Sequence, residues 1–288
     1  MVTAHVVKLA CELPESASRA LTLWTCNEIA KTLVRDKVVD RISGETVRRL
    51  LLAHKLKPWR IHHWLSANVA RDADFRRKID RICELYTRPF GPHERLLSVD
   101  EMTSIQPRPR TAPTRPPLPG NQPATLEHTY ERAGALNLLA AFDIHTGEVL
   151  SICRPRKRQV EFIELLARID QQTPPTITTL YLVCDNVPMH GGKEVQAWLR
   201  AHPRFQLVFT PVHCSWLNQV EQWFSIIQRK RLRAPNFKDL DALQQAIEAF
   251  VAEWNACRHP FKWTERSFDK IRAKIARVVA ETALKVAA

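Results

Sequence analysis

From Pro92 onward, the chain alternates short apolar segments typical of strands with amphipathic segments typical of helices. The expected order is three strands, a helix, a strand, a helix, a strand and a final helical stretch from about Asn218. The second and third strands lie in ALNLLAAFDIHTGEVLSICR and turn at His145-Thr146-Gly147, which is a hairpin signal. Three antiparallel strands followed by strand–helix units predict a mixed α/β sheet flanked by helices.

Residues 1–91 have a different texture and are expected to form a small helical region. Within it, LWTCNEIAKTLVRD and GETVRRLLLAHKL read as two short helices, with Thr25 or Asn27 and then Ser43 as N-caps. Such a pair, the second helix rich in arginine, is typical of a DNA-binding helix-turn-helix, here at about residues 25–56. The alternative is a helical hairpin with a solvated basic face. The residues expected to contact DNA are Ser43, Glu45, Thr46, Arg48, Arg49, Lys55, Lys57 and Arg60.

A further helix, in ARDADFRRKIDRICELY, carries mixed charges and is expected to be a solvated connector to a second domain over residues 92–288. Within that domain, residues 106–123 hold seven prolines in eighteen positions. Proline lacks a backbone donor and fixes φ, so this segment cannot be a helix or an inner strand. We expect either a semi-rigid extended excursion or a disordered surface loop.

The formal net charge is +13 at pH 7, and the isoelectric point is near 9.7. A surplus of this size favours nucleic acid as a partner, and anionic membrane surfaces next, because Lys and Arg on phosphates release condensed counterions. No apolar run approaches the roughly 20 residues that span a bilayer. Seven scattered cysteines without a C-x-x-C pair argue against a disulfide framework or a zinc cluster. A reducing cytoplasm is therefore the expected location.

Three acidic residues stand at the ends of the predicted elements: Asp100 on the first strand, Asp185 after the fourth, and Glu221 in the helix after the fifth. The order of elements matches the ribonuclease H-like fold, in which the first and fourth strands are neighbours. Crowded carboxylates raise one another's pKa unless cations neutralise them. Hard divalent ions such as Mg²⁺ are the natural partners, and two of them suit phosphodiester displacement.

The residues around these acids resemble a known family. LVCDNVPMH and HCSWLNQVEQWF, with Glu221 lying 36 positions after Asp185, resemble the transposase signature of the mariner-like superfamily, in particular its insertion-sequence-630 branch. LLSVDEM, WNACRHPFKWT and WTCNEIAKTLV extend the resemblance over nearly the whole chain.

The resemblance implies that Asp100, Asp185 and Glu221 are the D-D-E ligands of two Mg²⁺ or Mn²⁺ ions. It implies cleavage at transposon ends and attack of the freed 3′-hydroxyl on target DNA at TA, by a homodimer that holds two double-stranded DNA ends. It also gives the excursion after the first strand a role as a clamp on the partner subunit. A bacterial, nucleoid-associated location and no membrane association follow.

Neighbouring residues acquire supporting roles. Asn186 and His190 could orient water or phosphate, and for His190 a helix-capping or supporting role is equally open. His213 and Asn218 could hold the helix of Glu221 or touch DNA, whereas Trp216 and Trp223 are expected in the core. The basic residues expected to grip the DNA backbone near Glu221 are Arg229, Lys230 and Arg231.

Members of the resembled family have a longer N-terminal region with a further helix-turn-helix, so we expect this chain to begin partway through that region. Two alternatives to an active transposase therefore stay open. One is a transposase-derived DNA-binding protein of repressor type that does not transpose DNA. The other is a ribonuclease H-like nuclease with a different substrate.

Overall fold

A computed structural model describes residues 2–60, 73–120, 122–270, 272–273 and 276. The predicted helical stretch at the C-terminus extends into residues 277–288, which lie outside the described residues. The chain divides into two compact units, Met1–Ser66 and Ala67–Ala288, and each is described by itself.

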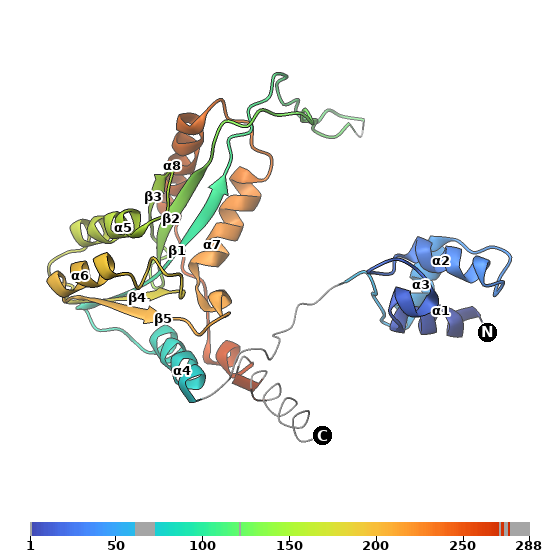
Figure 1. The fold of residues 1–288 in the computed structure, drawn as a ribbon, viewed down its shortest axis with the longest axis horizontal. Coiled ribbons are helices and arrows are strands. Elements are labelled where there is room, and N and C mark those ends of the chain that lie inside the picture. Colours follow the sequence, from blue (N-terminus) through green and yellow to red (C-terminus); the bar gives the residue numbers. More distant parts are fainter. Residues whose placement is uncertain (1, 61–72, 121, 271, 274–275, 277–288) are drawn as a thin grey trace. The chain divides into compact units, whose positions relative to one another are not determined.

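The first unit is a bundle of short helices, α1 (Val2–Cys11), α2 (Cys26–Arg35) and α3 (Gly44–Ala53), packed around Trp24, Ile29, Leu33, Val47 and Leu51 (Figure 1). Of the two candidates for the first N-cap, the structure has Thr25, and Ser43 is the second N-cap as predicted. Each accepts a hydrogen bond at 3.1 Å from the backbone N–H group three residues on. A Cβ at Gly44 would lie 1.9 Å from the Asn27 side-chain oxygen, so glycine allows the close approach of α2 and α3.

The second unit holds a five-stranded sheet in the order β3-β2-β1-β4-β5. The strands are β1 (Glu94–Ile105), β2 (Leu136–Asp143), β3 (Val149–Arg154), β4 (Thr179–Cys184) and β5 (Phe205–Phe209). β1, β2 and β3 pair antiparallel, and β4 is parallel to both β1 and β5. The turn between β2 and β3 contains Gly147, whose φ of +75° suits glycine. The predicted mixed sheet is confirmed.

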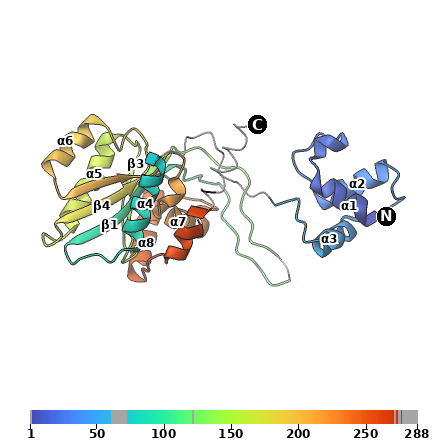
Figure 2. The ribbon, with the colours of Figure 1, turned by 90° about the horizontal axis from the view of Figure 1, so that it is seen from below.

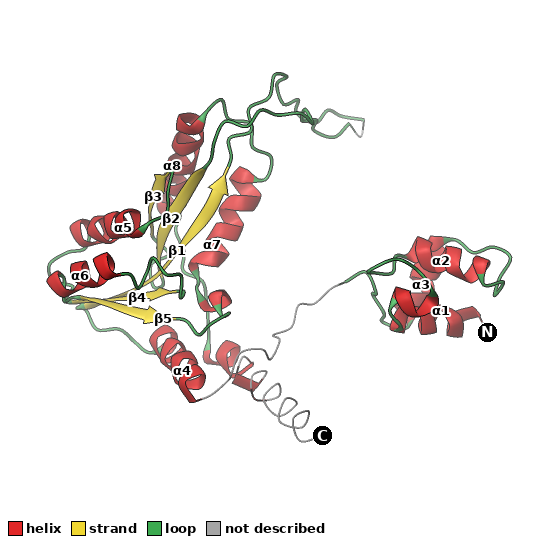
Figure 3. Ribbon diagram, in the orientation of Figure 1, coloured by secondary structure: helices red, strands yellow, loops and turns green. Residues whose placement is uncertain are grey.

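Helices cover both faces of this sheet (Figures 2 and 3). One face packs against α5 (Gln159–Gln172) and α6 (Lys193–Ala201). The other packs against α4 (Ala73–Thr87), α7 (Val220–Ile227) and α8 (Leu240–Ala256). In β1, Leu97 and Val99 point into the core on the side of α5 and α6, whereas Leu96 points into the core on the side of α4, α7 and α8. This follows from the alternation of side chains along a strand.

The prediction of a solvated connector before Pro92 is wrong. Helix α4 buries Phe75, Ile79, Ile82 and Leu85 in the same core as α7 and α8. Its charged residues occupy the other face, which is why the sequence reads as a surface helix. The compact units accordingly divide at Ser66, earlier than the boundary predicted at residue 91.

The proline-rich segment is an extended excursion between β1 and β2, as one of the two expectations had it, and it projects away from the sheet (Figure 1). Its base is fixed by bonds to the loop after α7: Phe237 N–H donates to the Pro107 carbonyl at 3.0 Å, and Arg110 N–H donates to Asn236 Oδ1 at 3.1 Å. None of the described helices is long and apolar enough to cross a bilayer.

Candidate active site

The sheet register brings two of the predicted acids together. β1 and β4 run parallel, and Ser98 of β1 pairs with Val183 of β4. Two residues further along each chain, the same pairing puts Asp100 beside Asp185. Glu221 lies in the first turn of α7, which packs on β1 and β2. The three predicted acids therefore come from one end of the β1–β4 pair and from the helix across it.

These carboxyl groups perturb one another. The pKa of Asp100 is raised to about 7, chiefly by burial and in addition by the charges of Asp185, Glu101 and Glu221, while a hydrogen bond from the Glu101 backbone N–H opposes the increase. Burial likewise raises the pKa of Glu221, with Asp185 and Glu101 adding to the effect. The site is thus short of positive charge as it stands.

His190 is fully buried and lies between two carboxylates. Its Nδ1 is 3.1 Å from Asp185 Oδ1, and its Nε2 is 3.5 Å from Glu101 Oε2. Burial opposes a charge on the imidazole, but the bonds to Asp185 and Glu101 outweigh it and raise the pKa of His190 to about 9. Burial also opposes the charged form of Asp185, yet the His190 bond prevails and lowers the pKa of that carboxyl. These contacts fit a residue that supports Asp185.

Glu101 is a fourth acid that the sequence reading missed. Its side chain is 3% exposed, and Lys157 Nζ lies 3.1 Å from its Oε1. Its position next to Asp100 in LLSVDEM is the one signal in the sequence. Burial between Lys157 and His190 depends on packing against distant segments and is invisible in the local pattern.

Asn218 is also fully buried, and its Nδ2 donates to Asp100 Oδ2 at 3.1 Å. Asn218 therefore contacts the first predicted acid directly. Because it is buried, it supports the site from the interior and is not positioned to touch DNA. Trp223 is fully buried and Trp216 packs partly buried against the same core, so the expectation for both tryptophans is confirmed.

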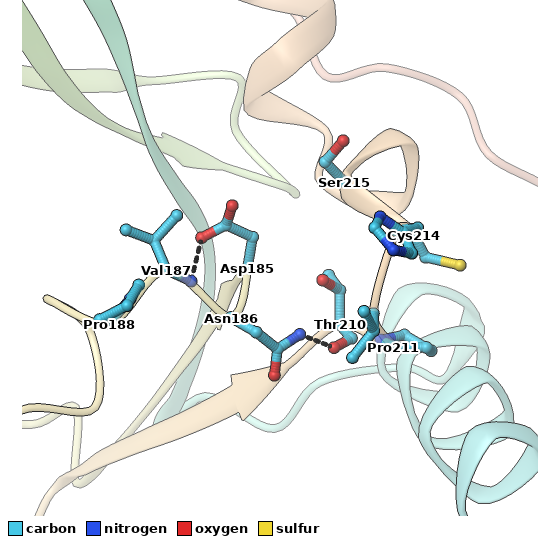
Figure 4. A pocket seen from close by; sticks show the side chains of 10 residues that line it. Asp185, Asn186, Val187, Pro188, Thr210, Pro211, Cys214 and Ser215 are labelled. Carbon is cyan, nitrogen blue, oxygen red and sulfur yellow. Dashed lines mark hydrogen bonds between the residues drawn. The ribbon is translucent and has the colours of Figure 1, made fainter. Parts of the chain in front are cut away.

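A pocket of about 360 Å³ opens beside Asp185, between the loop after β4 and residues 210–215 (Figure 4). Asn186 and His213 both line it and are both exposed. The Asn186 amide donates to the Thr210 carbonyl, which ties the two sides of the pocket together. His213 has a left-handed backbone with φ of +60°.

The basic run that follows α7 is exposed. Arg229, Lys230 and Arg231 lie on a π-helical turn, Gln228–Leu232, that continues α7 beyond Glu221. The Arg231 guanidinium packs 4.8 Å from the centre of the Phe237 ring. π-helical turns are uncommon and are frequent at functional sites.

The DNA-contacting residues predicted in the first unit lie at the N-cap of α3, along α3 and after it. Ser43 and Thr46 bond to each other at 2.9 Å within the cap, and Glu45 pairs with Arg48 at 2.7 Å. The remaining four are exposed: Arg49, Lys55, Lys57 and Arg60.

The donor set suits a hard divalent ion, because carboxylate oxygens are its preferred ligands and a cation would relieve the repulsion that raises the Asp100 pKa. Within the described ranges, no three His, Cys, Asp or Glu side chains already stand at the spacing of ligands to one ion. The residue types and their placement fit such an ion, and the side chains would have to close around it.

A sheet of this order, with helices on both faces, defines the ribonuclease H-like fold. The family described as DDE superfamily endonuclease matches residues 95–244, just over half of the chain. The chain belongs to this family.

Two kinds of relative agree with this assignment. The uncharacterised 39 kDa protein of insertion element IS630 from Shigella sonnei is 34% identical over 114 residues, which make up 40% of this chain and 33% of that protein. The match thus spans about a third of the length of this curated relative, and the predicted resemblance is confirmed over that stretch.

Among solved structures, the Mos1 mariner paired end complex with Mn is similar with a TM-score of 0.52 and 17% identity, over 97% of this chain and 78% of that one. The Mos1 strand transfer complex gives a TM-score of 0.51 and 14% identity, over 97% and 77%. At these identities the likeness concerns the fold, and it confirms the predicted ribonuclease H-like sheet.

Proposed function

We propose that this protein is a transposase that cleaves DNA at the ends of a mobile element and joins the freed ends to target DNA at TA. The observation that carries the proposal is the convergence of Asp100, Asp185 and Glu221 at one end of β1 and β4, within the range that matches the DDE family. In the first step water attacks a phosphodiester at the element end, and the bond to the 3′-oxygen breaks to release a 3′-hydroxyl. In the second step that 3′-hydroxyl attacks a phosphodiester of the target DNA, and a target 3′-hydroxyl leaves.

In this proposal, Asp100, Asp185 and Glu221 hold two divalent ions, Mg²⁺ or Mn²⁺. When bound, such ions supply a more acidic water and neutralise charge on the transferring phosphate. His190 holds Asp185 in place, and the buried Glu101 carboxylate balances the charge of His190. Because water and DNA hydroxyls act as nucleophiles, no covalent link between enzyme and DNA forms.

DNA binding is assigned to both units. In the first, α3 would enter a major groove of the element's inverted repeats. In the second, Arg229, Lys230 and Arg231 would contact phosphates close to Glu221. Two copies would hold the two DNA ends, with the excursion reaching the partner subunit. A bacterial cytoplasm, in association with the nucleoid, is the proposed location.

A second candidate is a transposase-derived protein that binds DNA without cutting it. The exposed basic residues on α3 and on the turn after α7 favour this candidate, because DNA binding needs these residues and does not need the acids.

The test incubates the full chain with duplex DNA bearing the element's inverted repeats, in Mg²⁺ or Mn²⁺. Strand nicking at the repeat ends is expected, and Asp185→Asn should abolish nicking while the affinity for DNA changes little. Glu253→Gln, an exposed acid on α8, is the matched control and should cut normally. Binding without nicking by the unaltered chain would establish the second candidate instead.

A further inference from the structure

We propose that Ser98 and Asn218 are positioning residues that lock the first acid of the site, Asp100, to the helix that carries the third, Glu221. The proposal rests on the proposed function in that these acids are taken as the catalytic set. It adds a buried hydrogen-bonded link, formed between β1 and the start of α7, that sets the separation of the two acids.

The strand places Ser98 toward α7. Side chains alternate along β1, so Ser98 and Asp100 share the face of Leu96, which packs in the core with α7. Ser98 is fully buried there. A hydroxyl in the middle of an apolar strand face destabilises the fold unless it is hydrogen-bonded, so its partners matter.

Ser98 caps α7 from another element. The first N–H groups of a helix have no partner within the helix, and Gln219, at the N-cap of α7, provides no capping side-chain bond. Instead, Val220 N–H donates to Ser98 Oγ at 2.8 Å. The Ser98 hydroxyl in turn donates to Asn218 Oδ1. The beginning of α7 is thereby fixed to β1 by a side chain 122 residues away in sequence.

Asn218 completes the link. Its side-chain Nδ2 donates to the Val99 carbonyl at 2.8 Å and to Asp100 Oδ2 at 3.1 Å. Its backbone carbonyl accepts a hydrogen bond from Glu221 N–H at 3.2 Å. The amide uses both donors and its acceptor, so one fully buried residue touches the Asp100 carboxylate and the Glu221 backbone.

A third anchor holds the residue before Asn218. The Tyr86 hydroxyl, from α4, donates to the Leu217 carbonyl at 2.9 Å.

Asp100 Oδ1 accepts from Glu101 N–H at 2.8 Å, so each Asp100 oxygen is held by one bond and keeps lone-pair capacity for a cation. Since Ser98 and Asn218 are both 0% exposed, neither can touch DNA, and Ser98 is excluded as a nucleophile.

The test measures Mn²⁺ binding by the full chain without DNA, by titration with detection of free Mn²⁺ by electron paramagnetic resonance. Asn218→Ala is expected to weaken Mn²⁺ binding by about 10-fold or more, as is typical when a group bonded to a metal ligand is removed. Ser98→Ala should weaken Mn²⁺ binding too, because it removes the hydroxyl that holds Asn218 and the start of α7. Ser98→Thr keeps the hydroxyl and should restore most of the affinity. The affinity for DNA should not change.

Asn255→Ala is the matched control for a merely structural role. Asn255 also joins a helix to a strand through two bonds, accepting from Val149 N–H at 2.9 Å and donating to the Val149 carbonyl at 2.8 Å, but it is remote from the acids. Its removal should lower the Tm and leave Mn²⁺ binding unchanged.

The outcomes separate this inference from the proposed function. If the unaltered chain binds Mn²⁺ and both alanine variants bind it equally well, the link does not position the acids. If Asn218→Ala fails to fold, the Mn²⁺ affinities of Ser98→Ala and Ser98→Thr decide whether the link positions the acids. Of these two variants, only Ser98→Thr keeps the hydroxyl. A chain that binds no Mn²⁺ in any form overturns both the inference and the proposed function.

Discussion

At the scale of single residues, the site is a cluster of acids arranged around one buried histidine. His190 bonds to Asp185 on one side and approaches Glu101 on the other, while Asp100 accepts hydrogen bonds from two neutral groups, the Glu101 N–H and the Asn218 amide. The consequence is an uneven distribution of charge. Asp185 is held ionised, whereas Asp100 retains a proton up to a pKa of about 7.

This unevenness predicts a pH-dependent stability. The ordinary pKa of an aspartate is 3.8, so in the metal-free chain the folded state keeps a proton on Asp100 that the unfolded state loses between about pH 4 and 7. Stability from this group falls as the pH rises through that window. Asp100→Asn should therefore stabilise the metal-free chain at pH 8 by on the order of a few kcal/mol, and much less at pH 4.

Urea unfolding at the two pH values measures this effect, with Glu253→Gln as the control. Added Mg²⁺ should raise the Tm of the unaltered chain at pH 8, since an ion bound only by the folded state stabilises it, and should have little effect on Asp100→Asn. An equal gain for Asp100→Asn at both pH values would show that burial of the Asp100 charge is not the cause.

At the scale of elements, α4 is the helix whose role changes most between sequence and structure. Its charged residues suggest solvation, but one face fills the core under the sheet and supplies Tyr86 to the loop before α7. Helix α4 is thus part of the scaffold that positions Glu221.

Ile82→Ala tests the placement of α4. Ile82 is fully buried, so its truncation should cost about 2–5 kcal/mol through lost transfer energy and a cavity. Arg76→Ala, at an exposed position of the same helix, should stay within about 0.5 kcal/mol. Chemical denaturation monitored by tryptophan fluorescence distinguishes the two variants. Equally small losses of stability in both would show that α4 does not pack in the core.

At the scale of the whole molecule, the charge of +13 is the property that a DNA partner would use. Electrostatic binding to duplex DNA weakens with salt in proportion to the number of phosphates neutralised. The exposed residues Arg229 and Lys230 lie on the turn that follows α7, the helix that carries Glu221.

The double variant Arg229→Ala/Lys230→Ala should reduce the slope of log affinity against log salt by about two. Lys193→Ala/Arg200→Ala, which removes two exposed charges from α6, is the control with the same change in net charge. Fluorescence anisotropy with labelled duplex DNA at several salt concentrations provides the slopes. Identical slopes for the two double variants would mean that the turn after α7 does not contact phosphate.

The sequence by itself determined the order of helices and strands, the hairpin at Gly147, the cap at Ser43, and the three acids as candidates. It left the cap of the preceding helix open between Thr25 and Asn27. Periodicity, turn residues and capping residues act over a few positions, so they can be read without knowing the fold. The alternation of side chains along β1 holds the strand register in the structure, because a one-residue slip would turn Leu97 and Val99 out of their core.

The tertiary structure alone decided how the site is supported. Glu101 is buried against Lys157 and His190, Ser98 caps a helix 122 residues further along the chain, and α4 packs under the sheet. Each of these contacts joins segments that are distant in sequence. Its energy depends on burial and on partners that exist only after the chain has closed on itself, so no local pattern encodes it.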